Sequence, residues 1–138
     1  MSFWILDTDS LSLFQRGNLE IARRLNRIDK SEFAITIVTV EEQIRGRFQV
    51  IRRADPDELV SAYQKLQITF DSLNSFNVLG FTVETQKIYT NLIRQKIKVG
   101  RQDLRIAAIA LSVNGILVTR NEQDFSQVPN LILVNWTL

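Results

Sequence analysis

The chain has 138 residues, of which 45% are hydrophobic and 23% charged, so it can bury the core of an ordinary globular protein. It contains no cysteine and no histidine, which excludes disulfide frameworks, thiolate nucleophiles, imidazole acid–base pairs and the usual zinc sites. The net charge is only +2, and no stretch approaches the roughly 18 apolar residues of a membrane span, so we expect a cytoplasmic protein with one domain over residues 1–138.

Short apolar runs alternate with amphipathic ones along the whole chain. Asp55 and Pro56 mark the start of one helix. Strands and helices that alternate in this way indicate a three-layer α/β/α sandwich on a mainly parallel sheet with right-handed crossovers. The expected strands are 3–6, 33–38, 76–81, 116–119 and 131–134, and the expected helices are 11–16, 19–28, 40–52, 57–73, 83–96 and 103–113.

The C-terminal third contains a helix, a turn, a strand and a polar exit in close succession. Asp103 begins a helix that is apolar on nearly every face, so we expect this helix to be buried. Asn114 supplies the left-handed residue that ends it. The next strand has no polar alternation, which is typical of a parallel sheet covered on both faces. Asn121 and Asp124 follow its carboxyl end, where such sheets bind their ligands.

Some acidic side chains fall where strands end or helices begin. Ordinary structural roles are open to them, because Asp7 or its neighbour Asp9 can cap a helix and Glu42 stands three residues after Thr39, the spacing of a capping box. The adjacent Glu41 should face elsewhere, since neighbouring helical residues diverge by about 100°. The four acids that we consider together are Asp7, Glu42, Asp103 and Asp124.

These four carboxylates, gathered at one edge of the sheet, would repel one another unless a cation neutralised them. An all-oxygen site selects Mg²⁺ or Mn²⁺. Such ions generate a hydroxide nucleophile from water and neutralise the oxygens of a phosphodiester under attack. This chemistry needs neither cysteine nor histidine.

Five motifs stand in order along the chain: LDTDS at 6–10, TIVTVEEQIRG at 36–46, GRQDLRIAAIAL at 100–111, LVTRNEQDF at 117–125 and VPNLILVNW at 128–136. Together they resemble the PIN domain, and in particular the VapC toxins of bacterial toxin–antitoxin pairs. The resemblance implies a PIN-like fold and a Mg²⁺-dependent endoribonuclease, commonly acting on structured RNA such as tRNA. It places the acidic metal site at Asp7, Glu42, Asp103 and Asp124.

The resemblance also implies a role for each side chain. Asp7 and Asp103 would bind the principal metal, and Glu42 would orient or deprotonate the attacking water. Asp124 would complete the metal shell or bind a second ion. Polar support of the site would come from Thr8, Thr119 and Asn121, and hypothetical phosphate contacts, for which plain surface charge is the alternative, are Arg101, Arg105 and Arg120.

One position departs from the pattern that this family shows. Asp9 stands where the family usually has asparagine, and the added carboxylate could join the metal shell, raise a neighbour's pKa or cap the helix. We favour the cap. VapC-like toxins generally form homodimers and are inhibited by a VapB-type antitoxin, so the resemblance implies both of these partners in addition to RNA.

Two other functions fit part of the sequence. Asp7 and Asp9 after an apolar strand match the D-x-D start of haloacid-dehalogenase-like phosphatases, with Asp7 as nucleophile and Asp9 as acid. Those enzymes need a further lysine and a later acidic motif in a larger core. A non-catalytic PIN-like module that binds RNA or protein would keep the fold, but it needs a broken acid set, and here the set is intact.

Overall fold

A five-stranded parallel sheet forms the centre of the molecule. The computed structural model describes residues 3–138. Within them β1 is the central strand, β2 and β3 extend the sheet on one side, and β4 and β5 extend it on the other. The strands are β1 (Trp4–Leu6), β2 (Phe33–Thr36), β3 (Asn77–Leu79), β4 (Ile116–Val118) and β5 (Ile132–Val134).

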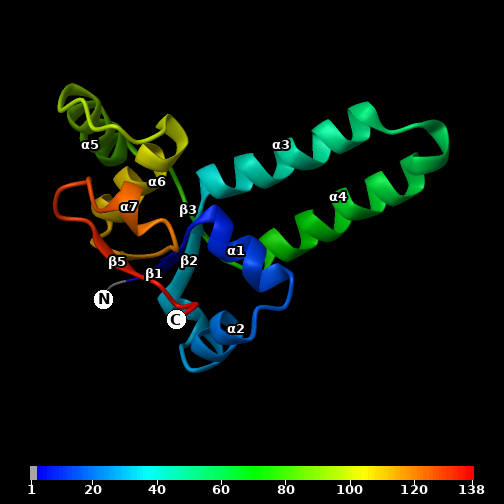
Figure 1. Cartoon of the computed structure of the whole chain (residues 1–138), viewed down its shortest axis with the longest axis horizontal. Helices are drawn as coiled ribbons and strands as arrows, with labels where there is room; N and C mark the ends of the chain where they lie inside the picture. The colour runs from blue at the N-terminus through cyan, green and yellow to red at the C-terminus, as the bar shows by residue number, and fades with distance from the viewer. Residues whose placement is uncertain (1–2) are drawn as a thin grey trace.

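Helices cover both faces of this sheet. Two of them, α3 and α4, form a long antiparallel hairpin that extends away from the sheet (Figure 1). The helices of the described residues are α1 (Thr8–Gln15), α2 (Leu19–Asn26), α3 (Ile37–Arg53), α4 (Leu59–Asn74), α5 (Val83–Arg94), α6 (Arg101–Ser112) and α7 (Glu122–Phe125), with short 3₁₀ turns at Lys30–Glu32 and Pro56–Glu58.

The core is divided into two clusters by the sheet. Successive strand residues point to opposite faces, and Ile5 and Leu117 pack with α5 and α6 whereas Leu6 and Val118 pack with α1 and α2. These two groups of helices lie on opposite sides of the strands (Figure 1). The predicted three-layer α/β/α sandwich on a parallel sheet is therefore confirmed.

The start of α3 differs from the prediction. The second strand ends at Thr36, not at residue 38, and the helix begins at Ile37. Thr36 is its cap, because the Thr36 hydroxyl accepts from the Thr39 N–H at 3.1 Å. The prediction that Thr39 caps this helix in a capping box with Glu42 is wrong. An apolar, β-branched run does not show where a strand changes into a helix, and the change comes earlier.

Helix α6 is positioned from both of its ends. It begins at Arg101, two residues before the predicted start, with Gly100 as its cap and Asp103 in its first turn. It ends at Ser112, and the left-handed residue that follows its C-cap is Asn114, as predicted, with a φ of 52°. The following Gly115 donates its N–H to the Ala110 carbonyl at 2.9 Å, as in a Schellman motif.

Other boundaries differ from the prediction by a few residues. The first helix begins at Thr8, directly after the strand, and the short helix α7 was not predicted. The break at Asp55 and Pro56 is confirmed, with a 3₁₀ turn between it and α4. Among the described residues, every helix is too short or too polar to cross a bilayer.

Candidate active site

Asp7 is fixed at the carboxyl end of β1. Its N–H donates to the Val118 carbonyl of β4 at 3.1 Å, and its carboxylate caps α1 by accepting from the Ser10 N–H at 2.8 Å. The residue is 5% exposed. Burial raises the pKa of the Asp7 carboxyl, and hydrogen bonds from Thr119 and Ser10 oppose the rise. The structural role considered for Asp7, the helix cap, is therefore present, and it holds the carboxylate at the sheet edge.

Glu42 forms a hydrogen bond with Thr8, the residue that follows Asp7. Because Thr36 caps α3, Glu42 is not used in a capping box, and its Oε1 accepts instead from the Thr8 hydroxyl at 2.6 Å. The Thr8 and Thr39 hydroxyl oxygens are 3.0 Å apart. This short chain of hydroxyl groups orients the Glu42 carboxylate toward the end of β1.

Asp103 lies in the first turn of the buried helix α6 and is itself partly exposed. Burial, and after it the negative charges of Glu42, Asp7 and Asp124 in that order, raise the pKa of the Asp103 carboxyl to about 6. Carboxylates from four separate elements therefore act on one another electrostatically.

Asp124 belongs to the short helix that follows β4. Its Oδ2 accepts from the Asn121 side-chain amide at 3.1 Å, and the Asn121 N–H donates to the Thr119 hydroxyl at 2.9 Å. Thr119 is fully buried. The three side chains form one hydrogen-bonded turn, which places Asp124 close enough to raise the pKa of Asp103.

A hollow of about 610 Å³ opens where these elements meet, at the carboxyl ends of β1 and β4. The chain leaves β1 toward β2 on one side of the sheet and later adds β4 on the other, so this is the point at which ligands bind in open α/β sheets. The predicted site residues that line the hollow are Asp7, Thr8, Glu42, Asp103, Arg120 and Asn121. Two residues that were not predicted as part of the site, Asp9 and Phe125, also line it.

The hollow is chemically suited to a hard divalent cation. Its carboxylates offer oxygen ligands only, and each negative charge disfavours ionisation of Asp103. The carboxylate oxygens are not tightly grouped. In the part of the chain that the structure describes, no three of these acids have carboxylate oxygens all within 4.8 Å of one another. Mutual repulsion accounts for that spacing, and a bound cation would relieve it.

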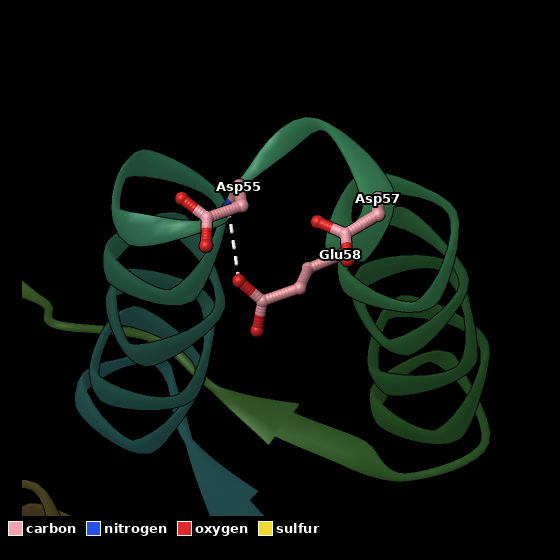
Figure 2. A group of neighbouring side chains, drawn as sticks. All are labelled: Asp55, Asp57 and Glu58. Atoms are coloured by element: carbon pink, nitrogen blue, oxygen red, sulfur yellow. Dashed lines mark hydrogen bonds between the residues drawn. The ribbon is translucent and has the colours of Figure 1, made fainter.

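A tighter acidic group lies elsewhere, at the far end of the α3–α4 hairpin (Figure 1). Oxygens of Asp55, Asp57 and Glu58 all lie within 4.8 Å of one another, and Figure 2 shows the three side chains around the turn. Glu58 accepts from the Asp55 N–H at 2.9 Å in a capping box. All three residues are exposed, so capping of the hairpin turn explains the group.

Asp9 does not cap α1, contrary to the favoured interpretation. The cap is Asp7, and Asp9 forms a bidentate ion pair with Arg120, with distances of 2.8 Å from Nε to Oδ2 and 2.9 Å from Nη2 to Oδ1. The pair raises the pKa of Arg120. Asp9 as the acid of a phosphatase is therefore not favoured either, because both of its oxygens are engaged by a cation.

The other two predicted phosphate contacts lie outside the hollow. Arg105 donates to the side-chain amide oxygen Oε1 of Gln102 at 2.7 Å and stacks over the ring of Tyr89, in a neighbouring hollow. Arg101 is exposed at the first position of α6. Glu41 also lines the neighbouring hollow, not the acidic one, and accepts from Gln102 at 2.9 Å.

Two features of the site were missed by reasoning from the sequence. One is Thr39, which was interpreted only as a cap and instead extends the hydroxyl chain to Glu42. The other is the contact between Asp9 and Arg120, which are 111 positions apart. The available signal was that Asp9 and Arg120 each lie within three residues of the end of a predicted strand, but the order of the strands in the sheet was needed to use it.

The fold and the acidic hollow define an α/β/α protein with a cluster of acids at the switch point of a parallel sheet. No protein-family model matches the chain. A ribonuclease VapC2 from Rickettsia felis is 35% identical over 68 residues, covering 46% of this chain and 51% of that relative. The chain therefore spans about half the length of this relative in the match. A ribonuclease VapC1 from Haemophilus influenzae is 25% identical over 142 residues, covering 97% and 98% of the two chains.

Solved structures have the same fold. The VapBC-1 structure from nontypeable Haemophilus influenzae superimposes with a TM-score of 0.74, 24% identity and coverage of 99% of each chain. The resemblance to VapC-type PIN-domain proteins, predicted from the sequence motifs, is thus confirmed by relatives and by the fold.

Proposed function

We propose that the chain is a Mg²⁺-dependent endoribonuclease and the toxin of a toxin–antitoxin pair, working as one PIN-like domain. The observation that carries this proposal is the convergence of Asp7, Glu42 and Asp103 on one hollow at the switch point of the sheet. The pKa of Asp103 is raised to about 6 there, which is the electrostatic sign of a site built for a cation. The relatives named ribonuclease VapC support the same activity.

Each acid has a distinct part in the proposed reaction. Asp7 and Asp103 would hold the principal metal, and Asp124 would complete its set of ligands. Mg²⁺, or Mn²⁺ in its place, would supply an acidified water and neutralise phosphodiester oxygens. Glu42, oriented by the Thr8 hydroxyl at 2.6 Å, positions the attacking water and accepts its proton.

The substrate in this proposal is structured RNA such as tRNA, the class that the resemblance implies. Arg120 lines the hollow and is placed to bind a phosphate near the bond that is cut. Asn121 and Thr119 shape the loop that carries it. Arg101 and Arg105 lie at the start of α6, where they would contact flanking phosphates.

Two protein partners belong to the proposal. A VapB-type antitoxin is supported by the solved VapBC structures with this fold. A second copy of the chain is supported by an apolar groove of about 360 Å³ along α3, lined by Ile37, Val40, Ile44 and Phe48. Sedimentation of the purified chain should give a dimer, and Phe48→Glu should give a monomer. Both protein partners, and an RNA substrate of the same cell, are consistent with action in the cytoplasm.

The decisive experiment is RNA cleavage by the purified chain with Mg²⁺, Mn²⁺ or a chelator, followed by sequencing of the RNA ends. Asp7→Asn and Asp103→Asn should abolish metal-dependent cleavage, whereas the exposed Asp71→Asn should not. Expression without a partner should be toxic, and Asp7→Asn should relieve the toxicity. Retained cleavage by folded Asp7→Asn and Asp103→Asn variants would refute the site.

A further inference from the structure

The mouth of the acidic hollow is crossed by an ion pair between two distant parts of the chain. Asp9 stands in the first turn of α1, and Arg120 follows β4. Both N–H···O bonds of the pair are short, at 2.8 and 2.9 Å, and both side chains are about half exposed, at 44% and 48%. Parallel double bonds of this kind fix the plane of a guanidinium, which a single contact does not.

Asp9 differs from the other acids of the hollow in its partner. Asp7 accepts from a backbone N–H and Glu42 from a hydroxyl, so both keep an uncompensated negative charge. Asp9 has its charge balanced by Arg120, and both of its oxygens are engaged. It is therefore set apart from the carboxylates that are suited to a metal.

Arg120 is also exceptional among the residues that line the hollow. In the described part of the chain it is the one cationic side chain in that lining. A guanidinium has five N–H donors, and Asp9 uses one on Nε and one on Nη2. The remaining donors have the planar arrangement that matches two oxygens of a phosphate.

We propose that Asp9 is a positioning residue, which holds Arg120 at the mouth of the hollow so that its remaining N–H groups bind the phosphate being attacked. This inference rests on the proposed ribonuclease activity and extends it to a residue outside the metal site. Arg120 touches the substrate, and Asp9 acts only through Arg120.

The two effects of Asp9 on RNA have opposite signs. Its negative charge weakens the general attraction between the hollow and a polyanion, so removing that charge leaves RNA binding equal or tighter. Its bidentate hold orients Arg120 for the transition state, so removing it slows the reaction. Asp9→Asn should therefore lower kcat, expressed per folded molecule, without raising KM, a split that a loss of simple charge attraction does not produce.

A double-mutant cycle of kcat on a defined RNA, measured with Asp9→Asn, Arg120→Gln and the pair, tests the assignment. We expect kcat to fall about tenfold with Asp9→Asn while KM stays equal or falls. In the Arg120→Gln background, Asp9→Asn should not lower kcat further, because the guanidinium that Asp9 positions is absent. The matched control is Glu122→Gln, which removes one exposed charge from the adjacent helix and should leave kcat unchanged.

Calorimetric titration of the RNA-free chain with Mn²⁺ gives a readout that is independent of turnover. The Asp9→Asn variant should bind Mn²⁺ with an affinity within about twofold of that of the unsubstituted chain. Loss of a metal ligand, or of a residue that supports one, lowers the metal affinity by roughly 10-fold or more. A large loss of Mn²⁺ affinity would overturn the inference and make Asp9 a metal ligand. Unchanged kcat in Asp9→Asn, or an equal loss in both backgrounds, would also overturn it. Failure of the unsubstituted chain to cleave any RNA would overturn the proposed function and this inference with it.

Discussion

Replacement of Asp103 by asparagine should stabilise the metal-free protein, and the gain should depend on pH. The asparagine side chain has the same shape but cannot ionise. In the folded protein, burial and the charges of Glu42, Asp7 and Asp124 raise the pKa of Asp103 from 3.8 to about 6. A raised carboxyl pKa means that the folded state binds the proton more tightly than the unfolded state. Ionisation of Asp103 therefore costs folding free energy.

The size and pH range of this cost follow from the shift. About two pKa units correspond to about 3 kcal/mol, at 1.36 kcal/mol per unit. Because Asp103 is partly exposed and water screens its interactions, we reduce this figure to about 1–2 kcal/mol. The cost is absent below about pH 4, grows as the pH rises toward 6, and is fully present above it.

Urea denaturation followed by tryptophan fluorescence measures the effect, since Trp4 and Trp136 pack with ring centroids 5.4 Å apart. With a chelator at about pH 7.5, Asp103→Asn should be about 1–2 kcal/mol more stable than the unsubstituted chain, and the difference should vanish near pH 4. Excess Mg²⁺ should narrow the difference, because binding stabilises only the chain that retains its ligand. The exposed Asp71→Asn serves as control. Equal stability at about pH 7.5, or a difference that does not change with pH, would refute the electrostatic reasoning.

Three further predictions concern the geometry of the site and the packing of the core. Glu42→Gln should lower the rate of RNA cleavage by about 10²-fold or more. Glu41 lines the neighbouring hollow, so Glu41→Gln should change that rate less than about threefold. Equal losses in the cleavage assay would contradict the orientation of α3. Thr8→Val removes the 2.6 Å hydrogen bond to Glu42 and should reduce kcat about tenfold. Thr8→Ser keeps the hydroxyl group and should retain the original kcat. A fully active Thr8→Val variant would show that Thr8 has no role in the mechanism. Gly115→Ala places a Cβ 2.5 Å from Cδ1 of the buried Ile5 and should cost about 1–3 kcal/mol in thermal or urea denaturation, whereas a variant as stable as the original chain would mean that this contact is easily relaxed.

The layer architecture could be predicted because its signals are local. The apolar run at 116–119, which has no polar alternation, identified a buried parallel strand, and the apolar character of α6 identified a buried helix. The end of α6 at Asn114 was likewise predictable, since a left-handed residue before glycine is a helix-ending signal in the sequence itself. Acids directly after strands then predicted where an oxygen-rich site would lie.

Details of the site could not be predicted, because they depend on which of several possible acceptors hydrogen-bonds to a given donor in the folded protein. Thr36 and Thr39 are equally good caps by composition, and only the packing of β2 against its neighbours selects Thr36. That selection releases Glu42 to bind Thr8. Similarly, Asp7 and Asp9 are both able to cap α1. Asp7 is the cap because the helix begins at Thr8, and Asp9 pairs instead with Arg120, which follows the adjacent strand β4.

The pairing of β1 with β4 also has a consequence for the timing of synthesis. Trp4 pairs with Ile116, so β1 must pair with a strand that is synthesised much later before the acidic hollow can form. A nascent polypeptide that has not yet reached Ile116 carries Asp7 and Glu42 but lacks the neighbouring strand that anchors Asp7 at Val118. The hollow therefore cannot form before Val118 has been synthesised and has joined the sheet beside β1.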